Sequence, residues 1–252
     1  MPDRDPVLLM PPPADLLDTA SLFLDFDGTL VELADRPDGV VVAPVLVDLI
    51  RALEEKLDGR LALVSGRPAG DLADLFGAHA PSVVGSHGME FRWSDGRREQ
   101  AERPAGLIAA LDAMRAFTEA HDDAILEDKP LGAAVHYRLN PALEADAMAL
   151  GERLAAEHGL YLQHGKMMVE VRTAGGDKGS AIRTLMADPR FAAGRPVFLG
   201  DDVTDEPGFS AVALLGGAGV LVGDPRPTDA RYRIDDVSGV LAWLATAAGV
   251  HA

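Results

Sequence analysis

The chain has 252 residues, of which 48% are hydrophobic, and it carries a formal net charge of −17 and no cysteine. The apolar content is enough for one large domain or two smaller ones. The lack of cysteine excludes disulfides, thiolate catalysis and sulfur-ligated metals. The acidic balance argues against nucleic acid as a partner, because phosphate-backbone binding needs a basic surface, whereas a small anion needs only a few local donors.

The first residues, M1-P-D-R-D-P-V-L-L-M-P-P-P13, are interrupted by prolines and carry acidic charge, which is a poor pattern for a signal peptide. No apolar run approaches the ~20 residues that span a bilayer, so we expect no membrane partner. We expect residues 1–19 to form a flexible tail, and we expect the protein to be cytoplasmic.

Short apolar runs then alternate with amphipathic segments. The pattern predicts buried strands at residues 22–26, 61–64 and 81–85, separated by helices at 46–57 and 68–76. Short strands that are apolar throughout, with helices between them, indicate a parallel sheet covered on both faces. The first part of the chain is therefore predicted to have an α/β fold.

The middle of the chain follows another pattern, in which helix, strand and strand occur twice. The predicted helices begin near residues 107 and 142, and the predicted strands lie at 124–127, 133–138, 160–163 and 167–172. The α/β alternation returns afterwards, with a strand at 196–199 and a closing helix from about Val237. We therefore predict a core domain of residues 20–103 and 174–252, interrupted by a smaller α+β domain with an antiparallel sheet at 104–173.

Polar side chains follow three strands of the predicted core. Asp25 and Asp27 end the first strand, S65-G-R67 follows the second, and G200-D-D-V-T-D-E206 follows the strand at 196–199. The carboxyl ends of parallel strands meet at one edge of a sheet. Several carboxylates at one edge repel one another and need a cation, and oxygen ligands favour Mg²⁺. The sequence therefore predicts a magnesium site at this edge.

A divalent cation beside an aspartate suits phosphoryl transfer. A carboxylate can attack phosphorus covalently, and the cation offsets the repulsion between the two anions. Lys178, in G175-G-D-K-G-S180, opens the helix after the inserted domain. Its point charge and the helix N-terminus both favour a phosphoryl oxygen. Lys178 is therefore a candidate for holding the transferring group.

In this order, D25-F-D-G-T29, Ser65, Lys178 and G200-D-D-V-T-D205 resemble the four motifs of haloacid dehalogenase (HAD) superfamily phosphatases. The resemblance implies a Rossmann-like parallel-sheet core with a cap domain. It also implies that Asp25 is the nucleophile that forms an aspartyl-phosphate. Asp27 would then be the general acid for the leaving oxygen and the base for the hydrolytic water.

The same resemblance implies the remaining roles at the sheet edge. Mg²⁺ would be held by Asp25, the backbone carbonyl of Asp27 and Asp201. Ser65 and Lys178 would hold the phosphoryl group. Asp205 would support either the metal site or Lys178.

The inserted domain resembles a type C2 cap. Five segments narrow the resemblance to the trehalose-6-phosphate phosphatases over residues from about 20 to 240: G85-S-H-G-M-E90, E127-D-K129, H136-Y-R138, M168-V-E-V-R172 and G200-D-D-V-T-D-E206. By this resemblance Glu127, Lys129 and Glu170 would bind the hydroxyls of the disaccharide. The other candidates for substrate binding are Gly66, Arg67, His87 and Arg138.

The predicted function is Mg²⁺-dependent hydrolysis of trehalose 6-phosphate to trehalose and phosphate, by a monomer. Two alternatives stay open. The first is a phosphatase of another sugar phosphate, such as sucrose phosphate, mannosyl-phosphoglycerate or a hexose phosphate. The second is a non-catalytic sugar-phosphate sensor or a regulatory partner. An enzyme is favoured by the complete set of Asp25, Asp27, Ser65, Lys178 and Asp201, because a binding module has no need of a nucleophile and a proton donor together.

Overall fold

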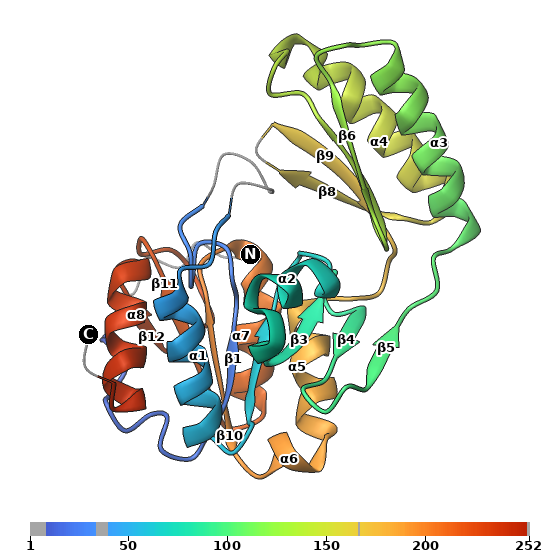
Figure 1. Cartoon of the computed structure of the whole chain (residues 1–252). Helices are drawn as coiled ribbons and strands as arrows, with labels where there is room; N and C mark the ends of the chain where they lie inside the picture. Colours follow the sequence, from blue (N-terminus) through green and yellow to red (C-terminus); the bar gives the residue numbers. More distant parts are fainter. Residues whose placement is uncertain (1–8, 34–39, 166, 251–252) are drawn as a thin grey trace. The chain divides into compact units, whose positions relative to one another are not determined.

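The computed structural model describes residues 9–33, 40–165 and 167–250. These residues form two compact units (Figure 1). Unit 1 takes its residues from Met1–Glu99 and Asp177–Ala252, and unit 2 takes them from Gln100–Gly176. Along the chain, unit 2 therefore interrupts unit 1, and each unit has its own sheet and its own apolar core. No helix in the described part of the chain is long and apolar enough to cross a membrane.

Unit 1 is built on an eight-stranded sheet of order β12-β11-β10-β1-β2-β3-β4-β5. Neighbours from β12 to β3 are parallel, and β4 pairs antiparallel with β3. This confirms the predicted parallel-sheet core, to which the structure adds β4, β5, β11 and β12. The strands are β1 (Ala20–Leu24), β2 (Leu61–Val64), β3 (Ser82–Gly85), β4 (Glu90–Arg92), β5 (Arg98–Gln100), β10 (Arg195–Gly200), β11 (Ala218–Val222) and β12 (Tyr232–Ile234).

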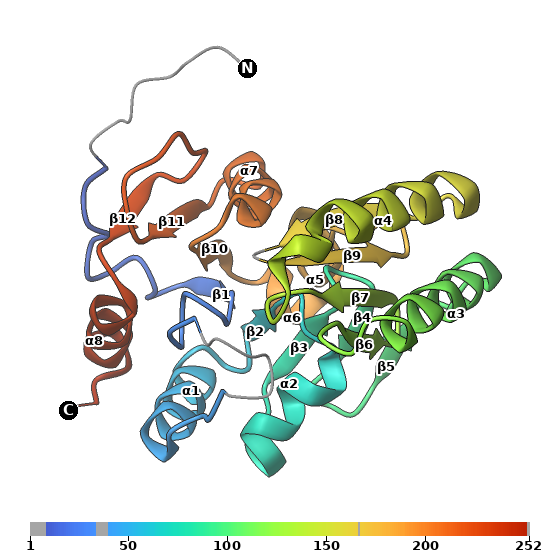
Figure 2. The same ribbon diagram turned by 90° about the horizontal axis from the view of Figure 1, so that it is seen from above.

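Helices cover both faces of this sheet, as strand β1 shows. All five of its residues are buried. Leu22 and Leu24 pack in a core with α1, α2 and α8, whereas Phe23 packs with α5 and α7 on the other face (Figure 2). Side chains alternate along a strand, so an apolar strand of this kind needs cover on both sides. The helices of unit 1 are α1 (Pro44–Lys56), α2 (Ala69–Phe76), α5 (Lys178–Ala187), α6 (Pro189–Ala192), α7 (Glu206–Leu214) and α8 (Val237–Ala248).

Residues 9–19, which belong to the expected flexible tail, pack onto unit 1. Leu17 is 1% exposed and lies in the same core as Leu22. The backbone N–H of Arg233 donates to the carbonyl of Met10 at 3.1 Å. The expected tail is therefore too long, because an apolar anchor and a backbone hydrogen bond hold this part of it in place. Residues 1–8 of the tail lie outside the described residues.

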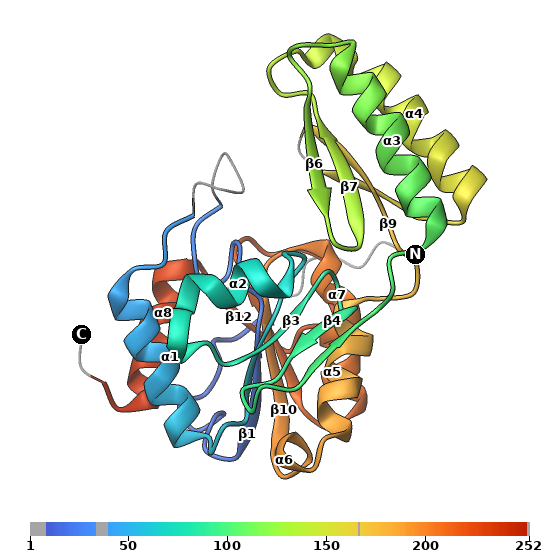
Figure 3. The same ribbon diagram turned by 45° about the vertical axis from the view of Figure 1, so that its right-hand side comes forward.

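Unit 2 has a four-stranded antiparallel sheet of order β6-β7-β9-β8. Helices α3 (Ala105–Glu119) and α4 (Glu144–His158) lie side by side on one of its faces (Figure 3). That face buries Ala133, Val135, Val169 and Val171, and the alternate positions of the strands face the other way. The strands are β6 (Ile125–Lys129), β7 (Gly132–His136), β8 (Tyr161–Gly165) and β9 (Met168–Arg172).

The two-sided cover of the unit 1 sheet gives a matched test of burial. We expect Leu22→Ala, which empties a fully buried site, to lower the free energy of unfolding by about 2–5 kcal/mol. The same substitution at Leu214, which is 83% exposed, should change it by less than about 0.5 kcal/mol. Urea unfolding followed by circular dichroism measures both. Equal losses in the two variants would contradict the packing described for β1.

Candidate active site

The site in unit 1 lies where parallel strands end. β1 and β10 run side by side with Leu24 opposite Leu199, so the residues that follow them emerge at the same edge. The first is Asp25, which is buried, and its backbone N–H donates to the carbonyl of Leu199 at 2.9 Å. The other is Asp201, which is partly buried. Two aspartates far apart in the sequence are thus brought together at the edge where α/β sheets bind ligands.

Lys178 lies between two of the buried carboxylates. Its Nζ donates to Oδ1 of Asp25 at 2.7 Å and to Oδ1 of Asp205 at 2.5 Å. Lys178 begins α5, where Asp177 caps the helix by accepting from the backbone N–H of Ser180. Burial lowers the pKa of Lys178, but the two carboxylates outweigh burial and raise it overall. The lysine is therefore held as a cation at a fixed place.

Asp205 uses both carboxylate oxygens within unit 1. Oδ1 accepts from Lys178, and Oδ2 accepts from the backbone N–H of Asp202 at 2.9 Å. The side chain is fully buried. Of the two roles that the sequence left open for Asp205, its contacts favour the support of Lys178.

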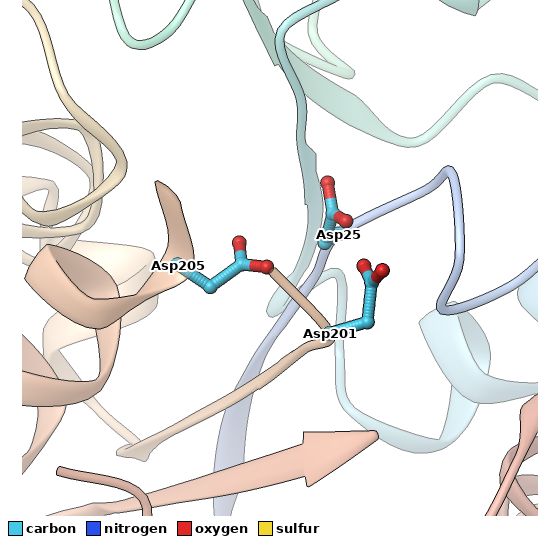
Figure 4. A group of neighbouring side chains, drawn as sticks. All are labelled: Asp25, Asp201 and Asp205. Carbon is cyan, nitrogen blue, oxygen red and sulfur yellow. The ribbon is translucent and has the colours of Figure 1, made fainter. Parts of the chain in front are cut away.

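Asp25, Asp201 and Asp205 form a compact acidic group (Figure 4). One carboxylate oxygen from each residue lies within 4.8 Å of those of the other two, and the three side chains point toward one another. Burial raises the pKa of Asp25 well above its usual value. Burial and then the charge of Asp205 raise the pKa of Asp201 to about 6. Carboxylate oxygens that destabilise one another in this way fit a hard divalent cation, so this group could hold a metal ion.

Glycine in D25-F-D-G-T29 has a steric reason. Gly28 adopts a φ of +80°, and a Cβ at this position would lie 2.2 Å from Oδ2 of Asp201. The residue after it, Thr29, places its Oγ1 3.4 Å from Oδ1 of Asp201. Any side chain at position 28 would therefore displace Asp201 as well as strain the backbone.

The side chain of Asp27 pairs with Arg67. Two parallel hydrogen bonds join them, from Nε to Oδ2 at 2.7 Å and from Nη2 to Oδ1 at 2.8 Å. The guanidinium also lies 5.5 Å from the ring centroid of Phe26. The sequence assigned Arg67 to the substrate, and the structure brings it to Asp27. Paired bonds from a planar guanidinium fix the orientation of a carboxylate.

Ser65, Gly66 and His87 are packed together next to this pair. Oγ of Ser65 accepts from the backbone N–H of Arg67 at 3.2 Å, and the N–H of His87 donates to the Ser65 carbonyl at 3.2 Å. A Cβ on Gly66 would lie 2.7 Å from the imidazole of His87. His87 itself has a φ of +55°, which is costly for a residue with a side chain and is common at functional sites.

Glu90 is a buried residue of this region to which the sequence assigned no role. It accepts hydrogen bonds from the hydroxyl of Ser86 and, at 3.4 Å, from the backbone N–H of Ala69 at the start of α2. It thereby ties the turn that carries His87 to a helix N-terminus. The signal for Glu90 in the sequence was its position within G85-S-H-G-M-E90. Its partner Ala69 lies some twenty residues earlier, and this contact was not predictable from spacing.

The candidate residues of unit 2 lie on the sheet face opposite α3 and α4. Nζ of Lys129 is 2.9 Å from Glu170 and 3.7 Å from Glu127, and Glu127 is 2.9 Å from Nε2 of His136. Burial favours the neutral forms of Glu127 and Lys129. Their partners outweigh it, so the pKa of Glu127 is lowered and that of Lys129 is raised. Three of the sequence-predicted residues are thus joined in one charged network.

Gly132 makes room for this network. It faces Lys129 across the β6–β7 pair and Arg172 across the β7–β9 pair. A Cβ here would lie 2.7 Å from Oε1 of Glu170. The sequence around Gly132 carries no signal of this role, because the clash depends on a neighbouring strand. The last candidate of this unit, Arg138, follows β7 and is exposed.

Comparisons with known proteins agree with these motifs. A family model described as trehalose-phosphatase matches residues 23–238. The chain is 40% identical over 235 residues to a probable trehalose-phosphate phosphatase of Sinorhizobium fredii, a match that covers 91% of this chain and 89% of the relative. It is 36% identical over 224 residues to a trehalose-6-phosphate phosphatase of Escherichia coli, with 88% and 84% of the two chains covered.

A solved structure agrees in fold. The C-terminal domain of a C. albicans trehalose-6-phosphate phosphatase matches with a TM-score of 0.80 and 22% identity, covering 96% of this chain and 99% of that one. The shared fold confirms the mixed α/β architecture, and the sequence matches confirm the resemblance seen in the motifs. The chain belongs to the trehalose-phosphatase family.

Proposed function

We propose that the protein is a Mg²⁺-dependent phosphatase that hydrolyses trehalose 6-phosphate to trehalose and phosphate through a phosphorylated Asp25. The observation that carries the proposal is the contact of buried Asp25 with Lys178, beside Asp201, in a chain of this family. A nucleophile, a fixed cation and a cluster of metal-type ligands at one sheet edge are the parts that phosphoryl transfer requires.

In this mechanism Asp25 attacks phosphorus and the sugar oxygen leaves. Lys178 holds the Asp25 carboxylate in place and offers its charge to the oxygens of the transferring group, together with the hydroxyl of Ser65. Mg²⁺, held by Asp25, the Asp27 carbonyl and Asp201, would offset the repulsion between carboxylate and phosphate. Asp205 keeps Lys178 in position.

Asp27 moves the proton in both halves of the reaction. It donates a proton to the leaving oxygen of the sugar, and its carboxylate then takes a proton from the water that hydrolyses the aspartyl-phosphate. The fork of Arg67 sets the direction of this carboxylate. We propose Arg67 as a positioning residue for Asp27, in addition to the expected place of Gly66, Arg67 and His87 near the substrate.

Unit 2 would act as the cap that recognises the part of the substrate that does not react. Glu127, Lys129 and Glu170 offer acceptors and a donor to sugar hydroxyls, and Arg138 is a further candidate. The network supports this proposal because a face made of paired charges can exchange its internal hydrogen bonds for bonds to a polyhydroxylated ligand. We further propose that the enzyme is a cytoplasmic monomer.

The first test is phosphate release from trehalose 6-phosphate, sucrose 6-phosphate, glucose 6-phosphate and a mannosyl-phosphoglycerate, each with Mg²⁺ and with a chelator. We expect Mg²⁺-dependent release with a strong preference for trehalose 6-phosphate, and none from Asp25→Asn. A preference for another sugar phosphate would support the proposed phosphatase chemistry but would show that trehalose 6-phosphate is not the preferred substrate. No release by the folded, Mg²⁺-supplied protein would favour the non-catalytic sensor.

The role of Asp27 predicts a dependence on the leaving group. We expect Asp27→Asn to lower kcat/KM for trehalose 6-phosphate by about 10²–10⁴-fold, because a sugar alkoxide needs a proton to leave. The kcat/KM for p-nitrophenyl phosphate, whose leaving group is stable as an anion, should fall much less, since kcat/KM does not include the later hydrolysis of the aspartyl-phosphate. Arg67→Gln should reproduce this pattern in weaker form if Arg67 positions Asp27. If Arg67→Gln instead raised KM for both substrates, the role of Arg67 would be substrate binding alone.

The charged network of unit 2 predicts an effect on binding. We expect Glu170→Gln to raise KM for trehalose 6-phosphate about 10–150-fold, because a hydrogen bond to a charged group contributes about 1.5–3 kcal/mol. KM for p-nitrophenyl phosphate should not change. The matched control is Glu157→Gln, on α4, where the carboxylate pairs with Arg153 at the surface. Equal effects on both substrates would contradict a sugar-binding role for Glu170.

The raised pKa of Asp201 predicts a pH-dependent stability. Between about pH 4 and 6 this carboxyl is protonated in the folded, metal-free protein and ionised in the unfolded chain. The folded state binds more protons in this window, so stability falls as the pH rises through it and stays low above it. Asp201→Asn removes this cost. Because Asp201 is only partly buried, we expect a gain of about 1 kcal/mol at pH 7.5, or ~2–4 °C in Tm.

Thermal unfolding of the metal-free wild type and Asp201→Asn at pH 4 and pH 7.5 measures the difference in Tm between the two proteins. We expect this difference to vanish at pH 4. Addition of Mg²⁺ should raise the Tm of the wild type and leave that of Asp201→Asn unchanged. Asp224→Asn, at an exposed carboxylate of the same unit, serves as the control. A loss of stability in Asp201→Asn at pH 7.5 would show that the ionised carboxylate is not a cost to the fold.

A further inference from the structure

The loop between β11 and β12 carries Arg226, whose side chain contacts the backbone of Asp201 and Asp202 at the proposed metal site. We propose that Arg226 is a positioning residue that fixes the direction of Asp201 by holding the backbone on which it stands. This inference rests on the proposed metal site, and it adds a determinant of metal affinity that lies outside the four motifs.

Arg226 contacts the backbone of the motif through one nitrogen. Its Nη2 donates to the carbonyl of Asp202 at 2.7 Å and, more weakly, to the carbonyl of Asp201 at 3.4 Å. The other terminal nitrogen, Nη1, donates to the carbonyl of Pro227 at 3.2 Å and to Oε1 of Glu206. The guanidinium therefore joins the β11–β12 loop to the segment from Asp201 to Glu206.

Glu206 completes the connection from the other side. It stands at the start of α7, and its Oε2 accepts from the backbone N–H of Asp229 at 2.8 Å. Glu206 thus binds the side chain of Arg226 and the backbone of the loop that carries it. The side chains of this ion pair are 21% and 27% exposed, so the pair is partly buried and still in contact with solvent.

The weaker contact of Arg226 and a contact of Asp205 meet at one peptide plane, and the stronger contact of Arg226 holds the carbonyl of the next plane. The carbonyl of Asp201 and the N–H of Asp202 belong to the same rigid peptide unit. Arg226 approaches the carbonyl side of this unit, and Asp205 accepts from its N–H at 2.9 Å. With both sides of the plane held, the backbone at Asp201 cannot rotate freely. Its carboxylate then stays directed toward Asp25, where the cation would bind.

Charge and geometry make opposite predictions for this residue. Arg226 is a cation near a proposed cation site, so by charge alone its removal should tighten Mg²⁺ binding. The carboxylate of Glu206 offsets that charge locally. If Arg226 acts by geometry, its removal should loosen Asp201 and weaken Mg²⁺ binding. Residues that orient metal ligands typically change affinity by about 10–100-fold.

The experiment is titration calorimetry of Mg²⁺ into the metal-free protein, together with steady-state kinetics. We expect Arg226→Gln to raise the Kd for Mg²⁺ about tenfold. Arg226→Lys should do nearly the same, because lysine keeps the charge but not the planar fork. At saturating Mg²⁺, kcat and the KM for sugar phosphate should return to wild-type values, which a general structural defect would not allow.

The matched control is Arg231→Gln. It makes the same substitution in the same loop, but the guanidinium of Arg231 lies over the ring of Tyr232, 5.3 Å from the centroid. Its Kd for Mg²⁺ should not change. Glu206→Gln should weaken Mg²⁺ binding less than Arg226→Gln, and the double variant should show less than the product of the two effects, because both act through one contact.

An unchanged or lower Kd for Mg²⁺ in folded Arg226→Gln would overturn the inference. Should that variant fail to fold, Arg226→Lys and Glu206→Gln carry the same test, and wild-type affinity in both would also overturn it. Failure of the wild-type protein to bind Mg²⁺ at all would instead remove the proposed metal site. The two failures are therefore distinguishable.

Discussion

The buried contact of Lys178 with Asp25 and Asp205 is the constraint on which unit 1 depends. A charge taken out of water is costly unless it is paired and hydrogen-bonded, and removing one partner leaves the others uncompensated. The three groups come from the end of β1, the start of α5 and the turn before α7. The chain can satisfy them only if these segments meet, so the same contact that would hold a phosphoryl group also fixes the sheet edge.

The buried charged groups at this sheet edge therefore lower the stability of the folded protein. Three carboxylates are grouped with one ammonium group, and the pKa values of Asp25 and Asp201 rise because of burial first and the charges of the neighbouring carboxylates second. Gly28 is needed because the Asp201 carboxylate lies where a side chain would be. Such local costs are common at functional sites, where the surrounding fold supplies the compensation.

Local pattern predicted much of the fold and of the site. The apolar run at residues 61–64 is β2, and Lys178 begins a helix as expected, because burial and capping act on neighbouring residues. The pairing of Asp27 with Arg67, the space left by Gly132 and the reach of Arg226 depend on distant segments, and no spacing reveals them. Pro207 lies in the first turn of α7, where its missing N–H is not needed.

The pairing of β1 with β10 has a consequence for how the chain folds as it is made. Ala20 is opposite Arg195, so one edge of the fully buried strand β1 has no partner until after the whole of unit 2 has been synthesised. At ~5–20 residues per second, that interval lasts on the order of ten seconds or more. Unit 2 can fold during this time, because its contacts lie within its own continuous segment. An open apolar strand edge favours wrong pairing, and the net charge of −17 opposes such pairing because like-charged chains repel one another.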